Sequence, residues 1–154
     1  MNKVAFFYAT FPRPTETFVR RELRAFAQVG FDPDLYSIWK GRSEWEGKKI
    51  LKFQFFRLLY LFFWIPYWAW LKPQVFKEIL VELWAKPCPN LQNWNETFLA
   101  LGFALVEAHN LKNKKYSLLH GIWATMPATA SLALSKLTNT PFSMGAHAYD
   151  VFRT

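Results

Sequence analysis

The chain has 154 residues, of which 52% are hydrophobic and 19% charged, so it suits one domain with a single core and is not disordered by composition. Its formal net charge of +8 favours anionic partners such as phosphate groups, acidic lipid or nucleic acid, and charge alone does not choose among them. The single cysteine excludes an intramolecular disulfide.

The amino-terminal part of the chain has the pattern of a strand, a helix and a second strand. Residues 3–9 form a short apolar run, which indicates a buried strand more than a signal peptide. A helix follows, which we expect Thr15 or Thr17 to cap at its start and Gly30 to end. Residues 35–39 predict the second strand. A βαβ unit of this kind predicts a parallel sheet.

The next part of the chain changes from polar to strongly apolar. Residues 40–49 are polar and charged and predict a loop. Residues 58–71 carry no charge, but they are interrupted by a proline and are too short for a membrane-spanning helix, which needs about 20 residues. Two interpretations stay open: a buried helix pair, or an interfacial segment with Lys52, Arg57 and Lys72 at its margins.

The carboxyl-terminal half continues the alternation of helices and strands. We expect helices at residues 73–85, 91–108 and 126–137, and strands at residues 116–123 and 141–148. The predicted fold class is therefore α/β, with a parallel sheet flanked by helices.

Ligands in open parallel sheets bind beyond the carboxyl ends of the strands, where loops enter the following helices. Residues 10–17, 123–129 and 147–150 form three such junctions. The first lacks the glycine fingerprint of dinucleotide binding, which argues against an NAD-type site.

Each candidate in the first two junctions has a functional and a structural interpretation. Arg13 offers a planar fork to phosphate or carboxylate, or is a solvated loop arginine. Thr125 opens a helix whose free amides favour an anion or a sugar hydroxyl, or it only caps that helix. Trp123 stacks on a sugar ring or fills the corner between sheet and helix.

His147 and Asp150 are the sharpest candidates in the third junction. A histidine that ends a buried strand lies in a cleft, and its pKa moves easily through neutrality, although backbone carbonyls also satisfy such a side chain. His109 and His120 lie elsewhere and complete no metal-ligand spacing. We expect neither a metal nor a cofactor.

Three segments resemble the family 4 glycosyltransferases of the exopolysaccharide and colanic-acid type. Residues 10–22 contain TFP and ETFV followed by a glutamate, which is similar to the family's "TFP…SETF…E". Residues 120–130 (HGIWATMPATA) are similar to "HxHF or HxHW…TMPAT", with Ile122 where relatives often have a second histidine. Residues 141–152 (PFSMGAHAYDVF) are similar to "PFSxxAHAxDIF".

The resemblance implies a GT-B fold, in which two Rossmann-like domains face each other across a cleft. The amino-terminal domain holds the acceptor and the carboxyl-terminal domain holds the nucleotide sugar; the enzymes are retaining and generally need no metal. Residues 1–154 would then be an acceptor-side domain that is incomplete at its carboxyl end. Without the donor domain, the chain alone is expected to be inactive.

Carried over by position, His147 faces the donor sugar and the reaction centre, and Asp150 supports the adjoining loop. Glu16, Thr17 and Trp123 line the acceptor side. The implied function is transfer of a sugar from a nucleotide-sugar donor to a glycan acceptor, in lipid-linked form, during surface polysaccharide synthesis. The implied location is cytoplasmic or peripheral on the inner face of the cytoplasmic membrane, where an anionic surface is a further partner.

Two other functions stay open. One is a non-catalytic acceptor-binding or membrane-recruiting subunit of a split glycosyltransferase. The other is a basic lipid-binding module that performs no chemistry. We expect no nucleic-acid partner, because the basic residues are scattered and form no basic and aromatic stripe.

Overall fold

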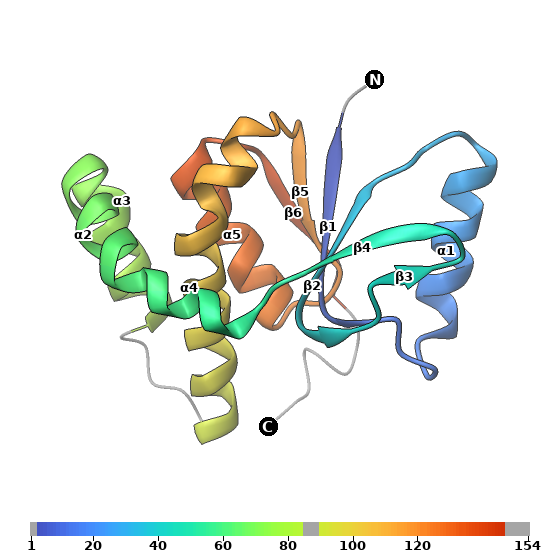
Figure 1. Cartoon of the computed structure of the whole chain (residues 1–154), viewed down its shortest axis with the longest axis horizontal. Coiled ribbons are helices and arrows are strands. Elements are labelled where there is room, and N and C mark those ends of the chain that lie inside the picture. Colours follow the sequence, from blue (N-terminus) through green and yellow to red (C-terminus); the bar gives the residue numbers. More distant parts are fainter. Residues whose placement is uncertain (1–2, 85–89, 147–154) are drawn as a thin grey trace.

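The computed structural model describes residues 3–84 and 90–146, which form a six-stranded sheet between helices (Figure 1). The strand order is β3-β4-β2-β1-β5-β6. The parallel strands are β1 (Val4–Phe11), β2 (Asp34–Gly41), β4 (Lys48–Lys52), β5 (Leu118–Gly121) and β6 (Phe142–Met144). The two-residue β3 (Glu44–Trp45) pairs with β4 in the antiparallel direction. The expected α/β fold and its parallel strands are confirmed in this part of the chain.

The helices lie in layers on the two faces of the sheet (Figure 1). Helix α1 (Thr17–Gln28) covers one face, and α4 (Leu91–Asn113) and α5 (Met126–Thr138) cover the other. A further layer lies outside α4 and comprises η1 (Phe55–Tyr60), α2 (Leu61–Leu71), α3 (Pro73–Glu78) and the π-helical turn η2 (Ile79–Trp84). The helix expected at residues 73–85 is therefore split at Ile79.

Strand β1 has a core on each side, which explains its continuous apolar sequence. Phe6 and Tyr8 face the α1 side, where they pack with Val19. Ala5 and Phe7 face the α4 side. The ring of Phe7 stacks on Tyr36 of β2 at 5.0 Å, so aromatic contacts bind adjacent strands together.

Helix α1 ends as expected and begins differently. Gly30 has φ of 73°, and the amides of Gly30 and Phe31 donate to the carbonyl oxygens of Ala27 and Phe26 at 3.1 and 2.9 Å. This is a Schellman motif, in which a glycine tolerates the left-handed conformation. The N-cap residue is Glu16, and no side chain caps the helix, so the expected threonine cap is wrong.

The loop expected at residues 40–49 is also wrong, because this stretch contains β3 and β4. Glu46 and Gly47 have positive φ values of 48° and 76° and make a tight turn between the two strands. The strands carry little apolar signal since only Ile50 of β4 is buried. Charged side chains are typical near the edge of a sheet, where they discourage further strand pairing.

The apolar segment forms η1 and α2, and only one side of it is covered. Trp68 of α2 is buried, and its indole N–H donates to the carbonyl oxygen of Leu105 on α4 at 2.8 Å. The opposite side of α2 is exposed, so complete burial of this segment is wrong for the described residues. No helix in the described ranges is long and apolar enough to cross a bilayer.

Helix α4 lies between the sheet and the outer layer, so its middle is covered all round. Every residue from Leu99 to Ala108 is buried. Gly102 permits close contact with η1, because a Cβ there would lie 2.7 Å from Cδ2 of Leu58. The first turns of α4 extend beyond the ends of the parallel strands (Figure 1).

Candidate functional site

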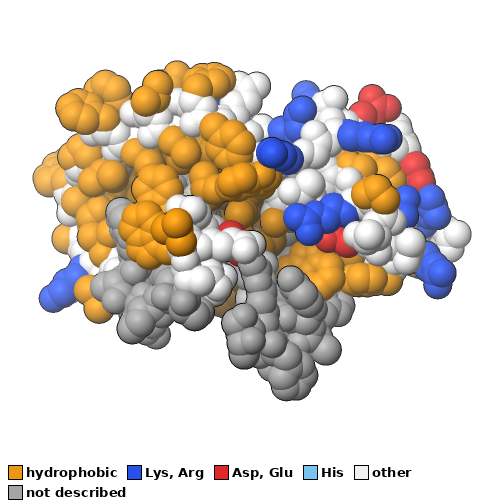
Figure 2. Space-filling model, turned by 90° about the horizontal axis from the view of Figure 1, so that it is seen from below, with side chains coloured by type: hydrophobic (Ala, Val, Ile, Leu, Met, Phe, Trp, Pro, Cys, Tyr) orange, Lys and Arg blue, Asp and Glu red, His pale blue; other side chains and the backbone are white. Residues whose placement is uncertain are grey.

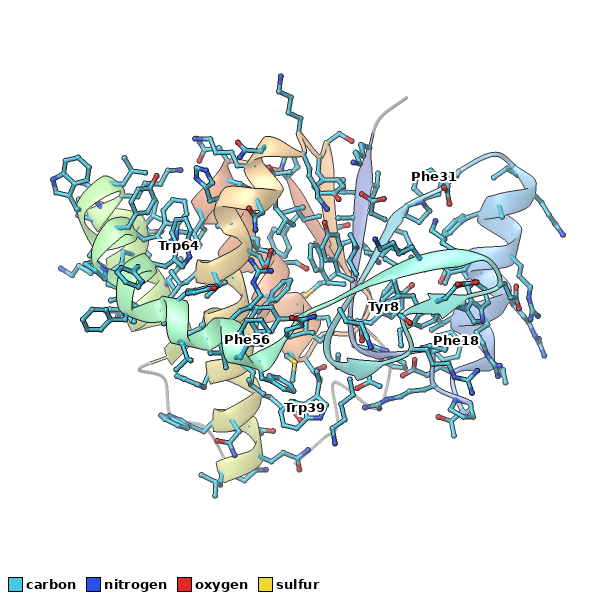
Figure 3. All side chains as sticks on the ribbon, in the orientation of Figure 1. Tyr8, Phe18, Phe31, Trp39, Phe56 and Trp64 are labelled. Carbon is cyan, nitrogen blue, oxygen red and sulfur yellow. The ribbon has the colours of Figure 1, made fainter. Side chains whose placement is uncertain are left out.

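A cleft of about 790 Å³ lies at the edge of the sheet where the parallel strands end. Three groups of residues line it: those that follow β1, those at the end of β2 and after β5, and those of the first turns of α4. This is the edge at which open α/β sheets bind ligands. Figure 2 looks onto this face, and Figure 3 shows Phe18 and Trp39 on the same side of the molecule.

Glu16 is the buried acid of the cleft. Its side chain lines the cleft although the residue is only 8% exposed. Its atom Oε2 is buried and has no hydrogen-bond partner among the described residues. Burial raises the pKa of Glu16, while the Arg13 guanidinium and a hydrogen bond from Trp123 oppose that rise. A buried carboxylate oxygen without a partner is costly, so this atom is suited to a donor group that a ligand brings.

Arg13 and Trp123 are the neighbours of this carboxylate. Nη1 of Arg13 lies 4.0 Å from Oε1 of Glu16, and the arginine side chain is about half exposed. Trp123 also lines the cleft, and its ring meets Phe18 edge to face at 5.6 Å. The cleft therefore combines a cation, a buried acid and aromatic walls.

Gly121 determines how closely α5 approaches the sheet beside the cleft. A Cβ at this position would lie 2.8 Å from the Cα of Ala128, so only glycine permits the contact. The amide of Ala128 donates to the carbonyl oxygen of Trp123 at 3.2 Å and closes the turn into the helix. Gly121 therefore fixes the position of Trp123 and Thr125 at the cleft.

Thr125 is the N-cap residue of α5, as expected, but its side chain makes no capping hydrogen bond. Its carbonyl oxygen instead accepts from the amide and the hydroxyl of Thr129 at 3.1 and 3.3 Å. The expectation that its hydroxyl caps the helix is wrong. Thr125 lines the cleft beside Met126, where its hydroxyl is a polar group for a ligand.

Four of the predicted site residues line this one cleft: Arg13, Glu16, Trp123 and Thr125. Thr17 begins α1, is exposed and does not line the cleft. The predicted residues His147 and Asp150 lie outside the described residues.

Helix α4 contributes residues to the cleft that were not predicted from the sequence. Gln92, Asn95 and Glu96 line the cleft, and the amide of Gln92 donates to Oε1 of Glu96 at 3.0 Å. Glu96 adds a second carboxylate to the cleft, besides that of Glu16. The spacing of these polar residues on one face of the first turns was the available signal. Trp39, at the end of β2, was missed in the same way.

The described histidines take no part in the cleft. His120 is half-buried on β5, its Nδ1 lies 2.7 Å from Oγ of Ser143, and its ring is 5.0 Å from that of Phe6. Burial lowers the pKa of His120. His109 on α4 lies 5.7 Å, ring to ring, from Trp64 of α2. Within residues 3–84 and 90–146 no three histidine, cysteine or acidic side chains gather as metal ligands would.

Comparison of the chain with models of protein families, with curated proteins and with solved structures finds no match. The indications of function are therefore the chemistry of the cleft and the three sequence motifs.

Proposed function

We propose that the cleft binds a glycan acceptor, and that the chain is the acceptor-side, Rossmann-like half of a retaining GT-B glycosyltransferase of family 4. The observation that carries the proposal is the convergence of two distant motifs. Arg13 and Glu16 come from the first, and Trp123 and Thr125 come from the second, and all four line one cleft. Motif residues that meet at a strand-end cleft are expected of a binding site.

The chemistry of the cleft suits a saccharide. Aromatic rings such as Trp123 and Trp39 offer faces to the apolar side of a sugar ring, and carboxylate and amide groups bind its hydroxyls. The buried Oε2 of Glu16 accepts a hydrogen bond from one such hydroxyl in this proposal. Arg13 then supplies a cation for a phosphate or an acidic sugar at the same site.

In the proposed reaction, an acceptor hydroxyl oxygen forms a bond to the anomeric carbon of the donor sugar. The bond from that carbon to the nucleoside diphosphate breaks, and the hydroxyl proton passes to an oxygen of the departing diphosphate. Glu16 orients the acceptor hydroxyl through a hydrogen bond. The resemblance implies that His147 faces the donor sugar and that Asp150 supports the adjoining loop. The nucleotide sugar is held by a second domain, so transfer requires that both halves hold their substrates in register.

Saccharide titration of ¹⁵N-labelled protein tests this role. We expect neutral disaccharides and a short-chain lipid-diphosphate sugar to shift the indole N–H signals of Trp39 and Trp123. The signal of Trp68 is an internal control that should stay in place, because its N–H is buried and bonded to Leu105. Glu16→Gln and Trp123→Ala should weaken the shifts.

The matched controls replace the same residue types away from the cleft. Glu44→Gln on exposed β3 and Trp70→Ala on exposed α2 should leave the titration with neutral disaccharides unchanged. If no saccharide moves the signals of Trp39 or Trp123, the cleft is not an acceptor site.

A further inference from the structure

The outer face of η1 and α2 is apolar and uncovered by the described residues. Leu59 is 76% exposed, Phe62 81%, Phe63 67% and Trp70 80%. These residues recur at helical spacing on the side opposite Trp68, which is buried against α4. We refer to Leu59, Phe62, Phe63 and Trp70 as the aromatic face. Figure 2 shows hydrophobic side chains gathered over the half of the molecule that carries α2 and α3.

A surface helix of a soluble domain normally has charged or polar residues on its outer side. Helix α2 has none, and its outer side is as apolar as its inner side. Contiguous exposed apolar surface of this kind marks a site of interaction with protein or membrane. The 11 residues of α2 give a length of about 16 Å, which is about half the hydrocarbon thickness of a bilayer. The helix can therefore lie on such a surface but not cross it.

A basic groove of about 510 Å³ lies beside η1. Lys49, Lys52, Arg57 and Lys114 line it, together with a single acid, Glu107. Arg57 pairs with that acid, so the charge of Glu107 is compensated within the groove. Arg57 belongs to η1 and lines the groove, so the basic groove and the aromatic face share one element.

We propose that the aromatic face docks on an anionic phospholipid bilayer, with lipid phosphates in the basic groove. Trp and Tyr side chains are enriched at the interface of membranes, and basic residues beside them attract anionic headgroups. A second copy of the chain is a poorer occupant, because two chains of net charge +8 repel each other. On an anionic bilayer, the aromatic face would contact the apolar part of the lipids while the lipid phosphates neutralise the cations of the groove.

The element η1, which carries Leu59 of the aromatic face, also contacts a residue of the cleft. The ring of Phe55 on η1 lies 5.4 Å from that of Trp39, which lines the cleft. Docking through η1 and α2 then places the bilayer against an element that contacts the cleft. This step rests on the proposed function, and it implies that the acceptor glycan is carried on a lipid.

Vesicle flotation tests the docking without any saccharide, so its outcome is independent of the cleft. We expect the chain to float with vesicles of phosphatidylcholine and phosphatidylglycerol, much less with phosphatidylcholine alone, and less as salt rises. The triple variant Phe62→Ser, Phe63→Ser, Trp70→Ser should lower the bound fraction at least tenfold. Val29→Ser, a change of another exposed apolar side chain at the end of α1, should leave it unchanged.

The charge test compares two double variants with equal net charge. Lys49→Glu with Lys52→Glu reverses two cations of the groove, and Arg21→Glu with Arg42→Glu reverses two exposed cations elsewhere. If the groove binds lipid phosphates, the Lys49/Lys52 variant should lose more vesicle binding than the Arg21/Arg42 variant. Circular dichroism of each variant establishes that it is folded.

Several outcomes would overturn the proposal. Recovery of the chain apart from vesicles of either composition would do so. Equal loss of binding in both charge variants would show only a general attraction of a basic protein. A concentration-dependent dimer that the triple serine variant abolishes, without flotation, would assign the aromatic face to a second copy.

Discussion

The ring of Trp39 meets the ring of Phe55 at 5.4 Å with an angle of 70° between their planes. Trp39 lies near the end of β2 and lines the cleft, whereas Phe55 begins η1 and the apolar outer layer. This edge-to-face contact links the candidate binding site to η1, the element that carries Leu59 of the aromatic face. Changes at the two residues therefore separate the proposed roles of cleft and surface.

The substitution Glu16→Gln is expected to stabilise the fold and to lower the affinity of the cleft for its saccharide ligand. Burial raises the pKa of Glu16, so its ionised form is disfavoured in the folded chain at neutral pH. Removal of that charge should raise the free energy of unfolding at pH 7 by on the order of 1 kcal/mol. The saccharide should bind about 5- to 10-fold more weakly, because a hydrogen bond to a carboxylate is stronger than one to an amide.

The stabilising effect of Glu16→Gln is also expected to depend on pH. A raised folded-state pKa means that Glu16 favours the fold most when it is protonated, and that this contribution is lost as pH rises through the folded pKa. The stability difference between variant and wild type should therefore shrink as pH falls towards about 4, the ordinary range for glutamate. Urea unfolding at several pH values measures it, and a difference independent of pH would contradict it.

Gly121→Ala should destabilise the chain and disturb the cleft. The new methyl group would meet the backbone of Ala128 at 2.8 Å, so α5 must move away from the sheet. Overpacking of this kind costs about 1–3 kcal/mol. Gly102→Ala is the comparison, because its nearest atom is the end of the Leu58 side chain, which can rotate, and alanine favours the helix. Urea unfolding should show the larger loss for Gly121→Ala.

The sequence predicted the centre of the sheet because the signal there is local. Strands β1 and β2 are apolar runs with cores on both faces, and helix α1 has buried residues at helical spacing. Strands β3 and β4 lack that signal, since their turn depends on the backbone of Glu46 and Gly47 and their exposed side chains are polar. The pairing of β4 with β2 is a tertiary contact, and no local sequence pattern predicts it.

The same distinction applies to the candidate site. Trp123 was found because a general rule places ligands at the carboxyl ends of parallel strands, and Glu16 was found through the resemblance to family 4 glycosyltransferases. Gln92 and Asn95 were missed because they reach the cleft only through the placement of α4, whose first turns extend past the sheet. Resemblance to the family was weak over residues 40–95, so no motif marked these side chains.

Nucleotide sugars should bind this chain weakly, because the proposal assigns the donor to a second domain. We expect UDP- and GDP-sugars to leave the indole signals of Trp39 and Trp123 in place under conditions where an acceptor saccharide moves them. Transfer by this chain alone should be negligible. Tight binding of a nucleotide sugar in calorimetry, or turnover without another domain, would refute the assignment of the cleft to the acceptor.

Substitutions at Trp39 and at Phe55 should have different effects on the binding of soluble and lipid-linked saccharides. Both rings are partly exposed, at 37% and 40%, so replacing either one should lower the free energy of unfolding by only about 1–2 kcal/mol. Trp39→Ala removes a wall of the cleft and should weaken a soluble saccharide and a lipid-linked one alike. Phe55→Ser should leave the soluble saccharide unaffected and weaken the lipid-linked saccharide in anionic vesicles about 3- to 10-fold, since burial of the exposed part of this ring in the bilayer contributes about 1 kcal/mol. Parallel titrations with soluble and vesicle-bound saccharide measure both effects. If Phe55→Ser weakens both ligands equally, η1 is part of the cleft wall and does not connect the cleft to a membrane.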